Sequence, residues 1–397
     1  MSPQTRAQHI DLHHKDFKKL CLANFLFAVS SYMILPLLLL WTDDTIELSQ
    51  CQRSSVMMSF GIGVFSLGAF CSYLIQRYRR NLVCLMSMLL FAVCILAFGY
   101  YDQELLHELS PKGSWLFVVV VRFLSGASFG LAYMVLNSTL IVDCCESSRR
   151  TRANVISMWF YRLAVVVGPL LGCLMYREMG FLNSLYFSLA VSVVPVGMLS
   201  SVQFPFKAPD ETVCVVSSDR FFSLRSYPLV GMTIALSASL GILLAMSVLA
   251  LCQLVSLVVG FLAALLVSFL LPTIVARPIS VYLGFALCMV GLVCVWSAVL
   301  FVACLGCLMM GIGVALVLQS LQVLLINVGD HCQRGTSQST YILSSEFGIA
   351  IGYSCVAIHG EAMRNSVVVE LASFLLFALL IYIFAQMFWI KKNLRKV

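Results

Sequence analysis

The chain has 397 residues, of which 61% are hydrophobic and only 11% are charged. Soluble domains carry about 25% charged residues, so this composition excludes a domain covered by water on all sides. The net charge of +7 comes from short basic clusters between apolar runs. That pattern is typical of loops at one face of a membrane and argues against a nucleic-acid-binding surface. The apolar runs do not alternate with polar residues, which favours helical spans over a transmembrane β-barrel.

Long apolar runs predict an all-α integral membrane protein with twelve transmembrane helices. The first run follows a polar stretch and is long enough to span, so we do not interpret it as a cleavable signal. Two apolar blocks, 227–271 and 279–327, are each too long for one span, and we divide them near 251–253 and 297–301. The other spans are expected at 18–41, 55–76, 82–101, 115–141, 154–176, 183–202, 337–358 and 367–389.

A polar stretch with two prolines and mixed charge, residues 203–226, divides the spans into equal sets. We therefore predict an N-terminal six-helix bundle over 1–202, a cytoplasmic linker over 203–226 and a C-terminal six-helix bundle over 227–397. Lys and Arg gather in alternate loops, which predicts a cell inner (plasma) membrane protein with both termini cytoplasmic. These loops hold Lys15, Lys18, Lys19, Arg77, Arg79, Arg80, Arg149, Arg150, Arg152, Lys207, Arg220, Arg225, Arg277 and Arg334.

The 16 cysteines lie mostly inside the expected spans, where a cysteine behaves as a small apolar residue. Cys51 is the clearest one in a loop, so no disulfide framework is predicted. Cys and His together do not form the spacing of a metal site, and no nucleotide-binding loop is present. We therefore expect neither a metal nor another cofactor, and any transport would run on an ion gradient or down the gradient of the substrate.

Residues Gly126 to Gly130 spell G-x-S-x-G, the pattern of a serine nucleophile elbow. Such an elbow needs a strand before the serine, a helix after it, and His and Asp partners. This segment is expected to be one continuous helix, and all six histidines lie near or outside the span boundaries. We therefore predict that the protein is not an enzyme. Small residues at this spacing are common where membrane helices pack closely.

Two motifs lie in consecutive spans of the first half. The fourth span carries R-x-x-x-G-x-x-x-G at Arg122, Gly126 and Gly130, and the fifth carries Gly-Pro-x-x-Gly from Gly168 to Gly172. With the loop "DCCESSRRTRANV" between them and "HCQRGTSQSTYILSSEFGIAIG" at the entry to the eleventh span, the chain resembles the major facilitator superfamily. It is similar in particular to bacterial drug/proton antiporter-like members, which implies two six-helix bundles working by alternating access. The resemblance implies a packing or gating role for Gly126, Gly130, Gly168, Pro169 and Gly172.

The loop after the second span departs from the superfamily pattern. Gln76 stands in place of its acid and Arg79 in place of a glycine, so the usual charge-relay latch is incomplete. In the equivalent loop of the second half, Arg277 is the only basic residue of the pattern that remains. Candidate gating or packing residues outside the two motifs are Arg77, Arg80, Arg334, Gly348 and Gly352.

Three charged residues lie deep inside expected spans. Arg122 shares a helix face with Gly126, Tyr133 and Asn137. A charge at this depth costs at least about 2.5–3.5 kcal/mol, so it should face the protein interior or water. Transport, a structural ion pair and a snorkelling side chain stay open for it. Arg162 is similarly deep, and structural and functional roles stay open for it as well.

Glu346 is the only acid well inside a span and lies on a stripe with Ser339 and Tyr353, away from Gly348 and Gly352. We expect it to carry a coupling proton with Arg122 and Arg162, because alternate burial and hydration would load and release one. A permanently protonated acid is the alternative. Polar candidates for a substrate path are Asn24, Ser31, Tyr133, Asn137, Gln319 and Gln322.

Taken together, these residues predict a secondary active transporter for proton-coupled export (efflux) of a small amphipathic organic molecule. Proton-coupled uptake of a small metabolite, or a transporter-like receptor that moves nothing, are the alternatives. The expected partners are the substrate, protons and the lipid bilayer, with no nucleic acid, and the protein is expected to be a monomer.

Overall fold

The computed structural model describes residues 15–45, 48–105, 110–141, 145, 150–202, 204, 214–248, 250–271, 277–297, 299–329, 333–359 and 364–390. Within these ranges the chain forms helices and no strands, which confirms the all-α membrane fold. Ten helices are long and apolar enough to cross a membrane, or eleven if one bent pair is a single span. The expected count of twelve stays a prediction.

The chain up to residue 202 forms one group of helices, which we call the first half. One of them, α7, is 51 residues long and joins two arms across Gly180, whose φ of 76° suits glycine. The elements of this half are α1 (Lys15–Asp44), α2 (Gln50–Ser66), α3 (Gly68–Arg77), α4 (Arg80–Tyr100), the π-helix η1 (Tyr101–Leu105), α5 (Pro111–Val135), the π-helix η2 (Leu136–Leu140) and α7 (Arg150–Ser200).

The chain from residue 224 onward forms the second half. Its two long apolar blocks break after Ser247 and after Trp296, within a few residues of the expected cuts. The elements are the 3₁₀-helix η4 (Leu224–Ser226), α8 (Tyr227–Ser247), α9 (Leu251–Leu270), α11 (Pro278–Trp296), α12 (Leu300–Val328), α13 (Arg334–His359), α14 (Arg364–Phe384) and the π-helix η7 (Ala385–Ile390).

Several helices begin where the local sequence favours a start. Ser49 caps α2 and forms a capping box with Gln52, and Ser110 caps α5 ahead of a proline in its first turn. Pro278 likewise opens α11. These local signals explain why helices begin at the loops, while the apolar length of each run sets how far it extends.

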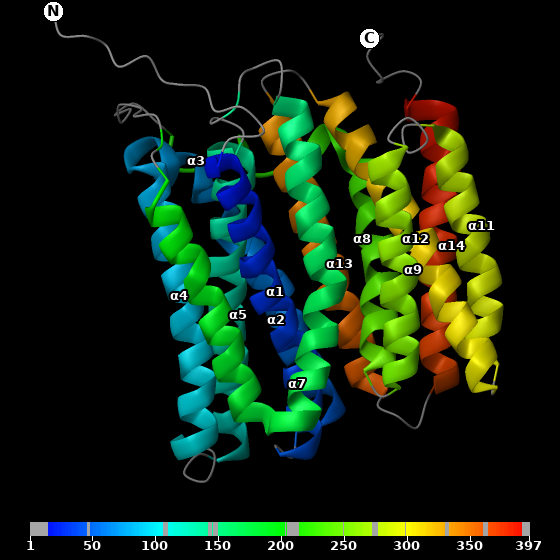
Figure 1. Ribbon diagram of the computed structural model, residues 1–397, viewed down its shortest axis with the longest axis horizontal. Coiled ribbons are helices and arrows are strands. Elements are labelled where there is room, and N and C mark those ends of the chain that lie inside the picture. Colours follow the sequence, from blue (N-terminus) through cyan, green and yellow to red (C-terminus); the bar gives the residue numbers. More distant parts are fainter. Residues whose placement is uncertain are drawn as a thin grey trace, which may run out of the picture.

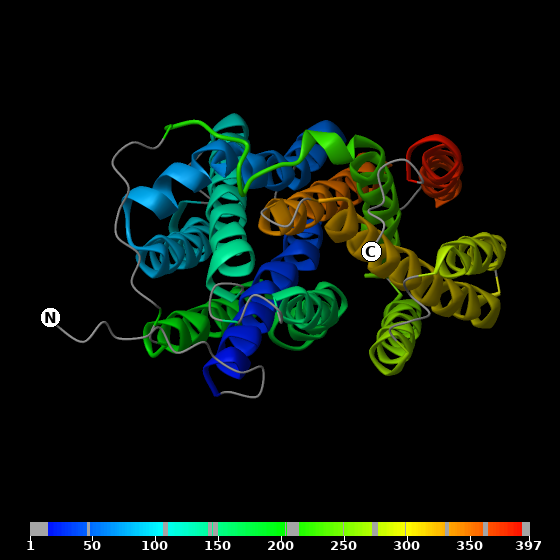
Figure 2. The ribbon, with the colours of Figure 1, turned by 90° about the horizontal axis from the view of Figure 1, so that it is seen from above.

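The helices run side by side, across the longest axis of the molecule (Figure 1). We call the end at which α1 begins and α14 finishes the upper end, as drawn in Figure 1, and the opposite end the lower end. Seen from above, α13 lies between the two halves next to α2 (Figure 2). It packs against α8 within its own half as well, so α13 forms much of the boundary between the halves, which we call the seam.

Glycines let backbones approach closely within each half. A Cβ at Gly126 or Gly130 of α5 would collide with a backbone carbonyl of α2, and one at Gly172 of α7 would collide with a carbonyl of α1. Gly348 and Gly352 of α13 meet carbonyls of α8 in the same way. The spacing of these small residues therefore corresponds to close helix contacts.

Hydrogen bonds cross the seam near both ends of the bundle. Trp159 of α7 donates through Nε1 to the Leu265 carbonyl of α9 at 3.2 Å, toward the upper end. Toward the lower end, Arg177 donates to the Val248 carbonyl at 3.1 Å. The two halves are thus in contact above and below the middle of the seam.

The segment before α8 ties the upper ends of the halves together. The Ser217 amide donates to the Ala69 carbonyl of α3 at 3.0 Å. The amides of Arg220 and Ser223 donate to Thr336 and Thr340 of α13 at 2.9 and 2.8 Å. This segment therefore bridges α3 of the first half and α13 of the second.

The second expected span is bent by 42° where α2 meets α3, which hydropathy did not predict. The ring of Phe221 occupies the space beside Gly68, where any side chain would collide with it. The bend thus lies at a contact with a residue about 150 positions further along the chain. A local pattern of hydropathy carries no signal for such a contact.

Candidate functional site

Glu346 of α13 lies at the seam and is 2% exposed. The hydroxyl of Tyr32 on α1 donates to its Oε1 at 2.6 Å, and the hydroxyl of Tyr161 on α7 donates to the same oxygen at 2.8 Å. The two hydroxyls lie 3.0 Å apart. A carboxyl group of the second half is therefore held by two tyrosines of the first half, and the three oxygens form one compact cluster.

Arg122 of α5 is 0% exposed, which agrees with the expectation that it faces the protein interior. None of its three guanidinium nitrogens has a hydrogen-bond partner among the described residues. Its Cζ lies 4.2 Å from the centroid of the Phe60 ring on α2, a favourable cation–π distance. Arg122 and Glu346 are close enough for their charges to interact, although no hydrogen bond or ion pair joins them.

Arg162 of α7 is 5% exposed and reaches across the seam in a different direction. Its Nη2 donates to the Gln322 side chain and, at 3.5 Å, to the Leu318 carbonyl, both on α12. Its guanidinium also lies 5.4 Å from the Tyr341 ring of α13 and 3.4 Å from that hydroxyl. The structure shows no hydrogen bond or ion pair from Arg162 to Glu346, so the meeting of these two side chains stays a hypothesis.

A second polar cluster lies inside the first half, between α1, η2 and α7. Asn137 donates through Nδ2 to Asn24 Oδ1 at 3.0 Å, and Ser157 donates to Asn137 Oδ1 at 2.6 Å. Asn24 donates in turn to the Ser157 carbonyl at 3.0 Å, and the Tyr133 hydroxyl donates to the Asn24 carbonyl at 3.0 Å. Asn137 lies in a π-helix, a local distortion that is frequent at functional sites.

Gln319 and Gln322, one turn apart on α12, have different surroundings. Gln322 accepts from Arg162 and donates to Gln338 of α13 at 3.2 Å. Gln319 is buried, and neither atom of its amide has a partner among the described residues. A buried amide left without partners costs about 1–3 kcal/mol, so Gln319 is suited to bind a group that enters the protein.

The remaining candidates lie at the positions expected from their spans. Ser31 is buried on α1. Gln76, which replaces the acid of the latch motif, donates to Ser72 on its own helix at 2.8 Å. Arg77 ends α3, Arg80 begins α4 and Arg334 begins α13, all at the upper end.

Sequence reasoning missed the aromatic partners of the buried charges. Tyr32 directly follows Ser31, and Tyr161 directly precedes Arg162, so each is adjacent to a polar candidate. A tyrosine in a span is usually part of the packed core, however. Phe60 carried no polar signal at all. The hydroxyl groups of the tyrosines were the available signal, because a buried hydroxyl needs a partner.

Within the described ranges, His, Cys, Asp and Glu do not gather in any group of three that could hold a metal ion. The side chains that meet at the seam are tyrosine, amide, arginine and carboxyl groups, of which the carboxyl group of Glu346 is the one that readily binds and releases a proton.

The chain resembles known transporter structures over most of its length. It matches a mutant form of the nucleoside transporter NupG with a TM-score of 0.63 and 13% identity, covering 94% of this chain and 100% of that chain. It matches a bacterial homologue of the iron transporter ferroportin in an outward-facing state with a TM-score of 0.66 and 14% identity, again covering 94% and 100%. It matches the human organic anion transporter MFSD10 (TETRAN) with a TM-score of 0.64 and 15% identity, covering 92% of this chain and 98% of that chain.

Sequence identities of 13–15% show only that these proteins and this chain share a fold. A comparison with curated protein sequences gives no match. The family model of the Major Facilitator Superfamily, however, matches residues 20–353, which is most of the chain and includes all three buried charges. With its helical membrane fold and its pair of span motifs, this chain belongs to the Major Facilitator Superfamily.

Proposed function

We propose that this membrane transporter exports a small amphipathic organic molecule in exchange for protons. The observation that carries the proposal is the carboxyl group of Glu346, buried at the seam and held by two tyrosines from the opposite half. Alternating access requires the halves to move against each other around a central site. A proton on Glu346 changes the hydrogen bonds that join those halves, so proton binding and motion are linked.

The protons in the cluster account for this link. Tyr32 and Tyr161 carry one hydroxyl proton each, and an ionised Glu346 accepts both. A hydrogen bond to a charged group contributes about 1.5–3 kcal/mol, against about 0.5–1.5 kcal/mol for a neutral one. Protonation of Glu346 therefore weakens the connection between the halves by about 2 kcal/mol, enough to shift a two-state equilibrium more than tenfold.

Arg122 supplies the electrostatic counterpart of this switch. Its guanidinium is buried without any hydrogen-bond acceptor among the described residues, and the Glu346 charge is within its electrostatic reach. A buried cation is costly unless an anion compensates it. We propose that ionised Glu346 compensates Arg122 in one state and that Arg122 drives release of the proton.

The substrate would contact polar groups of both halves. Gln319 offers an amide on α12 that has no partner among the described residues, and Asn24 and Asn137, which hydrogen-bond each other, are the candidates in the first half. The helices that carry these residues are otherwise largely apolar in sequence, which favours an organic molecule with one polar end. Uptake by proton symport would use the same residues, and the direction of proton flow distinguishes the two.

The test is Glu346→Gln in proteoliposomes, because the amide resembles the protonated acid and cannot release a proton. Substrate exchange should continue while uphill transport driven by a pH gradient is lost. Glu370→Gln is the matched control, since Glu370 is another acid in a helix of the second half but pairs with His359 at 2.8 Å. It should keep gradient-driven transport.

Gradient-driven transport that persists in Glu346→Gln would contradict the role of Glu346. If a compound stabilises the wild-type protein against heat but shows no counterflow, the protein is a transporter-shaped receptor and the proposal of transport is wrong. The altered latch at Gln76 is the feature that favours such a receptor.

We also propose that the upper end faces the cytoplasm, because the basic loops gather there. The chain provides natural labels at both ends. Cys51 is exposed at the start of α2, at the lower end, and Cys214 is exposed in the segment before α8. With Cys252 replaced by serine, an impermeant maleimide should label Cys51 in intact cells and Cys214 only after lysis. The opposite result would invert the proposed orientation.

A further inference from the structure

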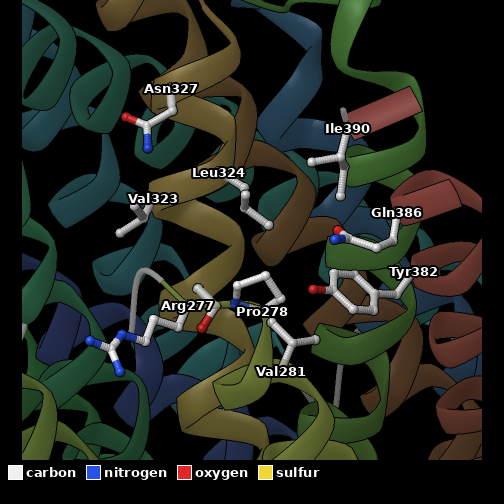
Figure 3. Close-up of a pocket in the computed structure, with 10 residues that line it drawn as sticks. Arg277, Pro278, Val281, Val323, Leu324, Asn327, Tyr382, Gln386 and Ile390 are labelled. Atoms are coloured by element: carbon white, nitrogen blue, oxygen red, sulfur yellow. The ribbon is translucent and has the colours of Figure 1, made fainter. Parts of the chain in front are cut away.

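A small cavity opens at the upper end of the second half, away from the seam (Figure 3). Its volume is about 140 Å³, and it lies between the upper parts of α11, α12 and α14. Sites for whole organic ligands usually measure about 300–1,000 Å³, so this cavity is too small for a transported molecule of that size. It can take a compact polar group.

The side chains that line the cavity are cationic or neutral, and none is acidic. Tyr382 is 1% exposed, and Figure 3 shows its hydroxyl turned toward Pro278. Gln386, one turn further along the chain in η7, directs its amide into the same space. Among the described residues no hydrogen bond joins either group to another side chain or carbonyl, so both are available to a group that enters the cavity.

Arg277 supplies the charge. It lies just before α11 and lines the cavity, and in Figure 3 its exposed guanidinium extends away from Tyr382 and Gln386. No described acid forms an ion pair with it. Asn327, near the end of α12, adds another amide at the same rim. An arginine with several neutral donors around a compact space suits a phosphate group.

The surroundings of the cavity are those of a lipid-facing surface. Ile279 and Leu283 on α11, and Met387 and Phe388 on η7, are apolar and exposed. These residues leave room for acyl chains beside the cavity, at the end of the helices where headgroups lie. Basic pockets between membrane helices at this level bind anionic headgroups.

From these observations we propose that the cavity bounded by Arg277, Tyr382 and Gln386 binds the phosphate of an anionic phospholipid. The phosphate accepts hydrogen bonds from the tyrosine hydroxyl and the amides, and Arg277 neutralises its charge. The site is separate from the seam and does not depend on what the protein transports.

The experiment uses the purified full-length protein in lipid-free detergent, titrated with phosphatidylglycerol, phosphatidylcholine or inorganic phosphate. Thermal unfolding measures stabilisation, and native mass spectrometry counts retained lipid. Phosphatidylglycerol should stabilise the wild type more than phosphatidylcholine does. Arg277→Gln should weaken phosphatidylglycerol binding about fivefold, the usual effect of one basic residue at a membrane surface. Tyr382→Phe, which removes only the hydroxyl, should weaken it in the same direction.

The matched control is Arg79→Gln, which removes one exposed arginine at the upper end of the first half. It should bind phosphatidylglycerol as the wild type does. An equal loss in Arg79→Gln would mean general surface attraction and would overturn the proposal, as would full binding by Arg277→Gln. Stabilisation by inorganic phosphate alone that equals that of the lipid would overturn the lipid assignment in favour of a free anion.

Discussion

Arg122 and Arg162 are both buried arginines in the first half, yet their surroundings differ. Arg162 donates to Gln322 and the Leu318 carbonyl across the seam and lies against Tyr341. Arg122 has no hydrogen-bond acceptor among the described residues, and its guanidinium lies against the face of Phe60. One arginine is a fixed connection between halves, and the other is held in place with its donors unused.

The difference indicates that a buried arginine can have two different roles. A buried, hydrogen-bonded arginine stabilises the arrangement in which its acceptors lie. A buried arginine without acceptors is costly unless another charge compensates it, so we expect Arg122 to respond to the protonation of Glu346. Substitutions at each arginine and at the groups between them test whether the two side chains differ in this way.

The largest effect is expected for Arg122→Ala. Without the guanidinium, the charge of ionised Glu346 loses its electrostatic counterpart, and we expect a transport loss of about 100-fold, which corresponds to about 2.8 kcal/mol. Arg122→Lys should restore little, because an ammonium does not reproduce the planar set of donors. Transport in proteoliposomes measures both variants, with thermal unfolding to show that they are folded.

Near wild-type transport by Arg122→Ala would mean that this arginine is structural or snorkelling. The double variant Arg122→Ala with Glu346→Gln separates the two outcomes further. If the charges work as a pair, the second substitution should add little to the loss from the first.

The next effect is expected for the tyrosines that connect Glu346 to the first half. Tyr32→Phe or Tyr161→Phe alone leaves one donor to the carboxyl group, so each should lower gradient-driven transport modestly. The double variant removes the last donor and should lower it about 10- to 100-fold, the effect of a hydrogen bond to a charge worth about 1.5–3 kcal/mol. Simple additivity of the two single effects would contradict a shared cluster.

Arg162→Ala should have a smaller effect on transport and a clear effect on stability. Its loss leaves Gln322 without its donor and removes a connection between α7 and α12. We expect about a tenfold loss of transport rate, with the ratio of gradient-driven transport to exchange unchanged. A double-mutant cycle with Gln322→Ala, followed by thermal unfolding, should give a coupling energy of about 1.5–3 kcal/mol. A coupling near zero would show that the contact does not hold the seam.

The sequence predicted the depth of these charges much better than their partners. Hydropathy placed Arg122, Arg162 and Glu346 inside spans, and all three side chains are buried within helices long and apolar enough to cross a membrane. Their partners come from other helices: Tyr32 lies 314 residues from Glu346 along the chain, and Tyr161 lies 185 residues from it. Periodicity specifies which face of a helix is polar, but it cannot specify which helix that face meets.

The fold likewise has features that the sequence predicted and features that it did not. The membrane class, the superfamily and the cuts in the two long apolar blocks followed from composition, motifs and length. The bend between α2 and α3 did not, because it coincides with the packing of Phe221 beside Gly68. Local sequence therefore predicts elements, and contacts between distant elements produce their bends.

The smallest effect is expected for Gly126→Ala, and it tests how Phe60 is held beneath Arg122. Gly126 lies one turn after Arg122, and a methyl group there would collide with the Phe60 carbonyl of α2. Separating α2 from α5 should cost about 1–3 kcal/mol of stability. Gly197→Ala is the matched control, since nothing lies within 4 Å of a Cβ at that helical glycine. The control should be unchanged or slightly more stable, because alanine favours helix. Equal stability of the two variants in thermal unfolding would show that α2 and α5 have room to separate, and that Phe60 does not fix Arg122.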